Sequence, residues 1–314
     1  TKFQALGYKH DLLAGVDVTR EKKTVYGDTP GLTGATRTAF YNALGLGKAT
    51  TTYGTPNDGA SVDESKRRFR PTSDYTSTGY GIYAQDTIEL TPAWKLVGGL
   101  RFDHLTGDYN THSYSYSGSG ADHSYDYFSY SGSTSYRMKI SEISKRVGVL
   151  YQPNELQSYH FSAGSSFNTS GDAYSINDQT VNTPPEQSLN IEFGTRLDSA
   201  DKRFTTRMAV FRSTKLHERN TDPDRDVAVL TGKRHVAGFE IDVAGRLNPR
   251  WEVFASYMWL PIAKVDQAVN VTTPGERQGD RPALTPVHSG TVWTTYQITP
   301  KFRVGGGLNF RGKQ

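Results

Sequence analysis

The sequence is dominated by segments in which apolar and polar residues alternate strictly. In 189–197 the odd positions are Leu, Ile, Phe, Thr and Leu, while the even positions are Asn, Glu, Gly and Arg. The same alternation runs through 94–103, 239–247, 251–259 and 302–310. A period of two places successive side chains on opposite faces of a β-strand, so each segment has one apolar face and one polar face.

The connections between these segments fall into two length classes. Tight turns rich in turn-forming residues occur at Thr91-Pro92, Gln152-Pro153-Asn154, Asp198-Ser199-Ala200-Asp201, Asn248-Pro249 and Thr299-Pro300. Long polar segments separate the hairpins at about 23–76, 108–137, 168–186, 214–232 and 262–286. Short turns at one end and long loops at the other are typical of an outer-membrane barrel, whose closed sheet satisfies every backbone polar group in lipid.

The pattern therefore predicts an all-β protein, an antiparallel transmembrane β-barrel with short periplasmic turns and long extracellular loops. Strands are expected at 11–22, 77–90, 93–107, 138–152, 157–167, 187–198, 202–213, 233–247, 250–261, 287–299 and 301–311. A short segment at 1–8 makes a twelfth. The alternation places Asp86 on the lipid-facing side near the periplasmic rim, where a charge costs little.

Composition narrows the class of protein further. Without Cys there is no disulfide framework, thiolate zinc site or Cys nucleophile. A net charge of +4 spread over 314 residues is too small and diffuse to indicate nucleic-acid binding. No stretch approaches the roughly 18 apolar residues of a membrane helix. The sequence begins at Thr1 without an initiator Met, and with the strand count this favours an internal piece of a longer chain.

Several short motifs follow one another along the chain. They are Gly81-Ile82-Tyr83-Ala84-Gln85-Asp86, Gly98-Gly99-Leu100-Arg101-Phe102-Asp103, Pro185-Glu186-Gln187-Ser188-Leu189-Asn190-Ile191-Glu192, Gly238-Phe239-Glu240-Ile241-Asp242 and Thr285-Pro286-Val287-His288-Ser289. With them the chain resembles the barrel domain of TonB-dependent ferric-siderophore receptors. The segments 166–172, 218–223 and 230–235 resemble the branch that takes up iron–catecholate complexes.

The resemblance implies a 22-stranded barrel in the bacterial outer membrane, closed around an N-terminal plug and energised by the inner-membrane TonB complex. We expect this chain, 1–314, to supply 11 or 12 strands, with the plug and the C-terminal strands outside it. Outer-membrane lipid and lipopolysaccharide are expected as surroundings. The siderophore itself would carry the iron, so no cofactor is expected.

A ferric catecholate is an anionic, aromatic complex, which cationic and aromatic side chains can hold. The aromatic candidates lie in 108–137 and are Tyr114, Tyr116, Tyr125, Tyr127 and Phe128. Tyr among Ser and Gly is also the composition of adaptable binding loops. Two other interpretations stay open for this segment: girdle or generic loop aromatics, or an alternating hairpin that extends the barrel above the membrane.

The cationic candidates form two groups. Arg67, Arg68 and Arg70 end the longest loop, where they could instead hold lipopolysaccharide phosphates or be solvated. Arg219, Arg225 and Arg234 flank another loop, in which acidic residues at 222, 224 and 226 offset them.

Charged residues on the polar faces of the strands form a third group: Arg101, Asp103, Glu192, Arg196, Glu240, Asp242 and Arg246. They are expected to contact the plug, although the wet lumen of a wide barrel is lined with charges in any case. Because the barrel pattern explains their spacing, no catalytic residue and no enzyme activity is expected.

Three other functions are weighed against siderophore uptake. A passive porin would share the strand pattern but lack a plug. A phospholipase or protease barrel would need a catalytic constellation at one rim. A haem, cobalamin or sugar receptor of the same family is open too, but the FRAP and NPNL motifs of haem receptors are missing, and metal ligation by His104, His112 and His123 is not expected.

Overall fold

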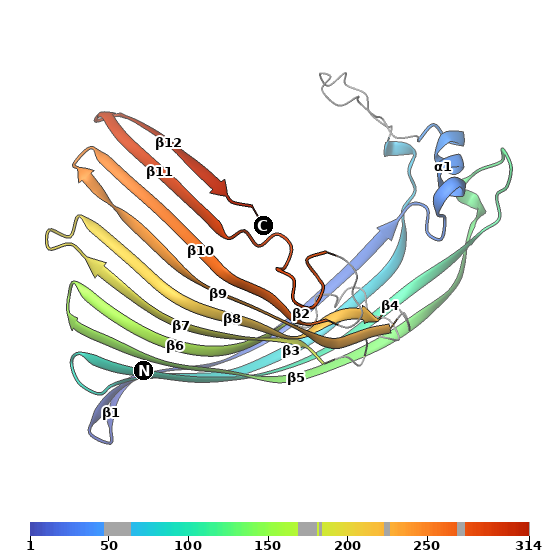
Figure 1. Ribbon diagram of the computed structural model, residues 1–314. Helices are drawn as coiled ribbons and strands as arrows, with labels where there is room; N and C mark the ends of the chain where they lie inside the picture. Colours follow the sequence, from blue (N-terminus) through green and yellow to red (C-terminus); the bar gives the residue numbers. More distant parts are fainter. Residues whose placement is uncertain (47–63, 169–180, 182–183, 223–226, 269–273, 314) are drawn as a thin grey trace.

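The fold was analysed on a computed structural model that describes residues 1–46, 64–168, 181, 184–222, 227–268 and 274–313, with backbone alone at 219–222 and 227–231. In these ranges twelve strands form one antiparallel sheet, ordered as in the sequence (Figure 1). Each strand pairs with its sequence neighbours, and β1 and β12 each pair on one side. The prediction of a partial antiparallel barrel is confirmed.

The strands are β1 (Lys2–Ala5), β2 (Tyr8–Gly27), β3 (Arg70–Glu89), β4 (Trp94–Tyr116), β5 (Phe128–Asn154), β6 (Gln157–Asn168), β7 (Glu186–Asp198), β8 (Phe204–Asp222), β9 (Val227–Asn248), β10 (Trp251–Gln267), β11 (His288–Thr299) and β12 (Phe302–Arg311). One α-helix, α1 (Gly34–Ala43), follows β2, and short 3-10 turns lie at Glu64–Lys66 and Tyr125–Tyr127. Among the described residues, no helix has the length and apolar character needed to cross a membrane.

Tight turns join the strands at one end of the sheet, on the left in Figure 1, and the long connections lie at the other end. The β1–β2 turn shows which backbone conformation such a tight turn requires. Leu6 and Gly7 have φ angles of 53° and 82°. Glycine adopts this left-handed conformation without steric cost, which makes so short a reversal possible.

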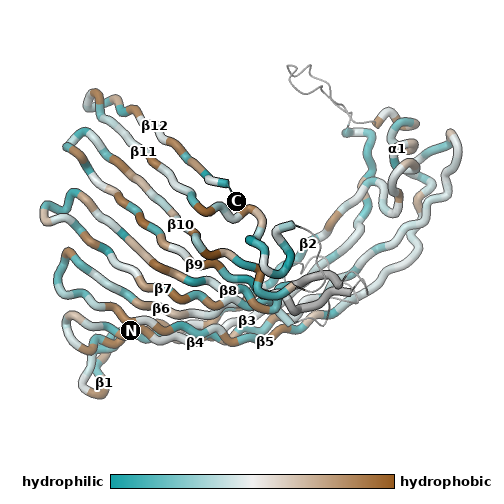
Figure 2. Tube along the Cα trace, in the orientation of Figure 1, coloured by the Kyte–Doolittle hydropathy of each residue, from teal (hydrophilic) through white to brown (hydrophobic). Residues whose placement is uncertain are grey.

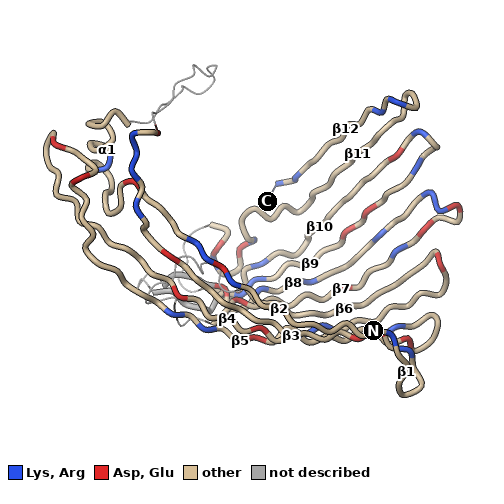
Figure 3. Tube along the Cα trace, turned by 180° about the vertical axis from the view of Figure 1, so that it is seen from behind, with Lys and Arg blue, Asp and Glu red and all other residues tan. Residues whose placement is uncertain are grey.

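The two faces of the sheet differ in polarity, as the alternation predicts. On one face Val16 lies opposite Ile82, which lies opposite Phe102. These side chains touch no opposing layer, and Val16 is 74% exposed. Charges alternate with apolar residues along the strands (Figures 2 and 3). An exposed apolar face of this extent requires lipid, so we call it the outer face and the charged one the inner face.

Two aromatic rows mark the limits of the apolar band on the outer face. Near the tight turns, Trp94 stacks on Tyr151 with ring centroids 4.5 Å apart. Toward the long connections, Tyr80 stacks on His104 at 5.1 Å. Aromatic girdles at both interfaces are a property of outer-membrane barrels. The hydrocarbon therefore covers β4 from about Trp94 to His104.

The outward Asp86 lies where the alternation places it. Its Oδ2 is 2.6 Å from Nδ1 of His10, and Nε2 of His10 lies 3.2 Å from the carbonyl oxygen of Ala5. The ring of Phe3 stacks on His10. The carboxyl group near the periplasmic rim is thus paired with an imidazole.

The predicted long loops are too long, and the strands continue beyond the membrane. β3 begins at Arg70 and not at 77, β4 continues to Tyr116, and β5 starts at Phe128. The boundaries of 108–137 were wrong, and the alternative of a hairpin extending the barrel is confirmed. The strands β8, β9 and β10 also extend into the predicted loops. Above the membrane both faces of a strand are wet, so the apolar period that located the strands disappears there.

The β4–β5 ladder continues further above the membrane than the β5–β6 ladder. The β5–β6 ladder ends, toward the long connections, where Arg146 pairs with Gly164, whereas β4 and β5 stay paired as far as Tyr116 and Phe128. The upper parts of β2 to β5 therefore form a separate four-stranded wall, and α1 lies at its tip (Figure 1).

Candidate ligand-binding site

The inner face of β2–β4 carries an ion cluster centred on Arg101. Its guanidinium lies 2.8 Å from Oδ2 of Asp17, donates to Asp103, and sits over the ring of Tyr83, 5.6 Å from the centroid. Gly81 makes this possible, since a Cβ there would collide with the guanidinium. One cation between two carboxylates leaves this cluster with one net negative charge.

The inner face of β6–β9 is acidic as well. Nε2 of His160 lies 2.8 Å from Oε1 of Glu192. On β9, Glu240 and Asp242 project to the same face and lie opposite Ala209 and Arg207. This second stretch of wall carries more carboxylates than close cationic partners among the described residues.

Arginines lie nearer the tight turns. Arg196 pairs with Asp198 at 3.0 Å, while Glu252 lies between Arg246 at 3.1 Å and Arg303 at 2.8 Å. All seven charges predicted to face inward therefore lie on the polar face. Four of them (Arg101, Asp103, Arg196 and Arg246) are in ion pairs with the chain's own residues, and Glu192 is hydrogen-bonded to His160. Contact with a plug stays a prediction.

At the extracellular end, several predicted ligand residues form a small core around α1. Phe40 is fully buried, and its ring meets those of Tyr125 at 4.9 Å, Tyr116 at 5.7 Å and Phe128 at 5.7 Å, all edge to face. Leu46 closes the cluster. We call this group the α1 core. In this structure Tyr116, Tyr125 and Phe128 hold the loop together.

Two of the three predicted arginines in 67–70 support the same core. Arg67 is 3.3 Å from the buried Asp28 and stacks on Tyr41, 5.3 Å from its ring centroid. Arg70 donates to the backbone oxygen of Tyr125 and sits over Phe128. Each guanidinium is therefore engaged with the protein itself.

Of the other predicted residues here, Arg68 is exposed, whereas Tyr114 and Tyr127 are half-buried, and Tyr114 packs against the α1 core. Arg68 makes a solvent-exposed pair with Asp126 at 2.7 Å. The hydroxyl of Tyr114 donates to the carbonyl of Pro71. Tyr127 donates to a carboxylate, and that hydrogen bond raises its pKa, so it remains a neutral phenol. The cation of Arg68 therefore stays exposed, while the two tyrosine rings are partly covered by their neighbours.

A second aromatic cluster lies on the inner face below the α1 core. Tyr75, Tyr109, Met138 and Ile140 are buried there, and Phe167 of β6 packs against them. Phe167 thereby bridges the gap at which β5 and β6 separate. The upper inner wall of β3–β5 is therefore apolar and aromatic, in contrast to the charged wall nearer the membrane.

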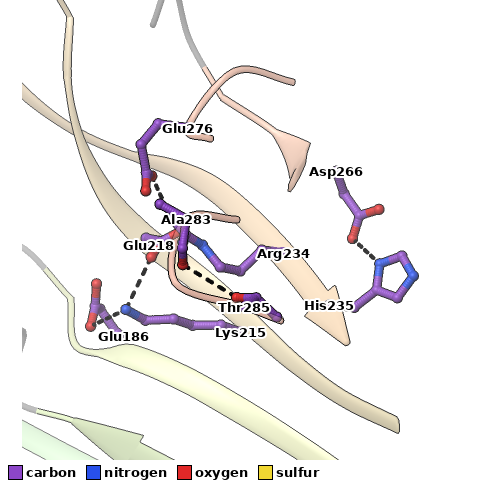
Figure 4. A network of polar contacts seen from close by, with 9 residues as sticks. All are labelled: Glu186, Lys215, Glu218, Arg234, His235, Asp266, Glu276, Ala283 and Thr285. Carbon is purple, nitrogen blue, oxygen red and sulfur yellow. Dashed lines mark hydrogen bonds and ion pairs between the residues drawn. The ribbon is translucent and has the colours of Figure 1, made fainter. Parts of the chain in front are cut away.

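The upper inner wall of β7–β10 ends in a charged network (Figure 4). Arg234 donates to Glu218 and to Glu276, the latter on the segment that follows β10. Lys215 lies 3.1 Å from both Glu186 and Glu218. We call these five residues the β8–β9 network. Glu186 and Glu218 are each only 8% exposed, and the network has more carboxylates than cations.

The remaining candidates are two arginines of the β8–β9 hairpin and three histidines. Arg225 and the side chain of Arg219 lie outside the described residues. His104, His112 and His123 do not converge, because they bond separately to Ser141, Asp74 and Tyr116. Among the described residues, no group of three potential ligands could hold a metal ion.

Two parts of this end were not found from the sequence. The first is α1 with Phe40, which lies within the predicted loop 23–76. The second is the set of partners of Arg234. A signal existed for Lys215 and Glu218, because charges three positions apart can meet across an irregular strand, and the β8–β9 register shifts just there.

A charged inner wall, a lipid-facing outer wall and an elaborated extracellular end define a bacterial outer-membrane β-barrel of the receptor type. The family model described as "TonB dependent receptor-like, beta-barrel" matches residues 2–314. The chain belongs to this family.

Relatives agree with that assignment. The chain is 26% identical over 332 residues to the probable TonB-dependent siderophore receptor PiuA of Acinetobacter baumannii, covering 99% of this chain and 42% of that protein. It is 26% identical over 315 residues to the catecholate siderophore receptor Fiu of Escherichia coli K12, covering 96% of this chain and 39% of Fiu. The chain thus spans about two fifths of the length of these relatives.

Solved structures show the same fold. The crystal structure of the ferric-catecholate import receptor Fiu from E. coli in its closed form matches with a TM-score of 0.78 and 23% identity, over 99% of this chain and 43% of that one. The crystal structure of PiuA matches with a TM-score of 0.74 and 22% identity, over 99% and 44%.

Proposed function

We propose that the receptor containing this chain takes up a ferric siderophore, of the catecholate class, across the outer membrane with energy from the TonB complex. The chain supplies part of the barrel, and an N-terminal plug and further strands lie outside it. No resident cofactor takes part, since iron arrives and leaves with its chelator. Nothing covalent happens to the ligand, so the chain is not an enzyme.

One observation supports this proposal above the others. The wall ends at its extracellular side in two chemically different regions. The first, on β3–β5, is aromatic, with Tyr114 and Tyr127 half-buried and the cation of Arg68 exposed beside them. The second, on β7–β10, is a charged network whose two cations are paired with three carboxylates. An anionic aromatic complex offers rings for stacking and negative charge for cations. A simple size filter needs no such aromatic elaboration, which favours a receptor over a porin.

The test uses the complete receptor in detergent. Ferric catecholate, ferric hydroxamate and haem are titrated separately while tryptophan fluorescence is followed. Saturable quenching by the catecholate at the lowest concentration is expected. Quenching by the hydroxamate or by haem alone would contradict the ligand class.

A second measurement tests the energised step. Uptake of radiolabelled iron by cells producing the receptor is compared with and without a functional TonB complex. Uptake should require TonB. TonB-independent passage of small solutes of many kinds would instead support the porin alternative.

A further inference from the structure

The outer face of β2–β5 changes character just above its extracellular aromatic row. The ladder register fixes which residues share a row on this face. From the membrane outward the rows are Val16–Ile82–Phe102–Ile143, Val18–Tyr80–His104–Ser141, Arg20–Thr78–Thr106–Lys139 and Lys22–Thr76–Asp108–Arg137. An apolar row, an aromatic row and two cationic rows thus follow one another directly.

The four cations of these rows are exposed and little used by the chain. Arg20, Lys22 and Lys139 are solvent-exposed and, within the described residues, have no ion-pair partner. Arg137 lies 3.5 Å from Asp108, with 64% of its side chain exposed. With one carboxylate among four cations, the surface is strongly positive.

Packing on the other side of β5 holds these side chains outward. Met138 and Ile140 are buried in the inner aromatic cluster, at 4% and 5% exposure. Alternation then forces the side chains of Arg137 and Lys139 to the outer face. The direction of these cations is therefore set by the core behind them.

The position of these cations relative to the membrane follows from the two aromatic rows on the outer face. The apolar band of an outer-membrane barrel is about 25 Å tall, and basic residues just outside it meet the phosphates of lipid headgroups. The cationic rows begin two residues above Tyr80 and His104. By contrast, Arg67 and Arg70 lie near α1 and are engaged in its core.

We propose that Arg20, Lys22, Arg137 and Lys139 form a binding site for the phosphorylated headgroup of an outer-leaflet lipid. The row between Arg20 and Lys139 spans three strand spacings, about 14 Å, which accommodates two phosphate groups side by side. Hydroxyl groups of Thr76, Thr78 and Thr106 lie between the cations as hydrogen-bond donors. The inference rests on the proposed outer-membrane setting and is independent of the siderophore.

The experiment measures lipid binding by the complete receptor in detergent micelles. The patch variant is Arg20→Gln with Lys139→Gln. Purified lipopolysaccharide is titrated against the wild type and the variant, and bound lipid is counted by native mass spectrometry. Each basic residue near a charged lipid surface contributes about fivefold in affinity, so the variant should bind about 30-fold more weakly.

The matched control is Arg250→Gln with Lys301→Gln, which removes one Arg and one Lys from exposed positions in the tight turns at the opposite end of the sheet. It should bind lipid like the wild type. Enzymatically dephosphorylated lipid should not distinguish the wild type from the patch variant. Equal weakening in patch and control variants, or an unchanged difference with dephosphorylated lipid, overturns the proposal.

Two further readouts separate the possible failures. The heat-dependent shift in gel mobility that folded barrels show must match in all variants, and Lys22→Gln serves as a milder replacement if the double variant does not fold. Inorganic phosphate is added as a competitor, and full displacement at low millimolar concentration would assign the patch to free phosphate, against the proposal. Iron uptake by the wild-type receptor is measured in parallel. If the wild type binds lipid as expected but takes up no iron, the result counts against the proposed function alone.

Discussion

The upper ends of β2–β5 and of β7–β10 consist of the same kind of strand, but different side-chain contacts stabilise them. The first pair of hairpins continues far above the membrane and closes over the α1 core, an apolar and aromatic cluster centred on Phe40. The second ends in the β8–β9 network, where Arg234 and Lys215 hold three carboxylates. Aromatic residues in a barrel loop can therefore serve folding, and the two cations of the polar rim are engaged by the chain's own carboxylates.

The α1 core should be the more sensitive of the two to a single substitution. Phe40→Ala removes a fully buried ring and leaves a cavity, so the extracellular end should lose about 3–5 kcal/mol of local stability. Hydrogen exchange of α1 and of the β4–β5 tip measures this loss.

The control for Phe40 is Phe69→Ala, because Phe69 is 55% exposed. Exchange in the membrane-spanning strands should stay unchanged in both variants. If Phe40→Ala leaves the protection of α1 intact, the packing described for the core does not govern its stability.

The β8–β9 network should respond next. Arg234→Ala leaves the buried Glu218 and also Glu276 without their guanidinium, at a cost of about 2 kcal/mol. The segment 274–287 loses one of its ties to the wall, so limited proteolysis should cut there faster. Arg203→Ala, which removes an exposed pair with Asp201 and an exposed hydrogen bond to the backbone oxygen of Leu247, is the matched control.

Arg68 and Arg70 offer a smaller and more selective comparison. The exposed pair of Arg68 with Asp126 contributes little to stability, so Arg68→Ala should leave unfolding by urea unchanged. Its affinity for a ferric catecholate should fall about two- to fivefold, as an exposed cation–π contact predicts. Arg70→Ala should instead destabilise the α1 core. Equal ligand affinity in wild type and Arg68→Ala would remove Arg68 from the candidate site.

The smallest expected effect is a pH dependence confined to the four-stranded wall that the upper parts of β2 to β5 form. A hydrogen bond from Thr24, followed by one from His112, lowers the pKa of Asp74 below its ordinary 3.8. A carboxyl with a lowered pKa stabilises the folded state fully above 3.8, and this contribution disappears as the pH falls through the lower folded value. Amide exchange around 70–76 should therefore accelerate in strong acid, and Asp74→Asn should abolish that acceleration.

Much of the fold could be predicted from the sequence because lipid imposes one rule on every strand. Residues such as Ile191 and Phe239 must face hydrocarbon, and Glu192 and Glu240 must not, so both the strands and their two faces follow from alternation. The same rule gave Arg101 and Asp103 their side of the sheet. Above the membrane the rule no longer applies, and there the boundaries of β3, β4 and β5 were wrong.

The extracellular end depends on contacts between residues far apart in sequence. Phe40 meets Tyr116 and Tyr125 only because β2 to β5 rise together, and no local pattern marks that meeting. The aromatic and cationic composition of the loops indicated a ligand. It could not distinguish the rings that pack inward from those that stay at the surface.

The β4–β5 hairpin also rises above the described part of its neighbour β6. Extending the β5–β6 register brings Asn168 level with Glu142, so residues 128–141 stand above the described end of β6 by about 45 Å measured along the strand. On this side of the barrel, a bulky ligand therefore has to pass the whole height of this hairpin before it reaches the inner face of the membrane-spanning strands.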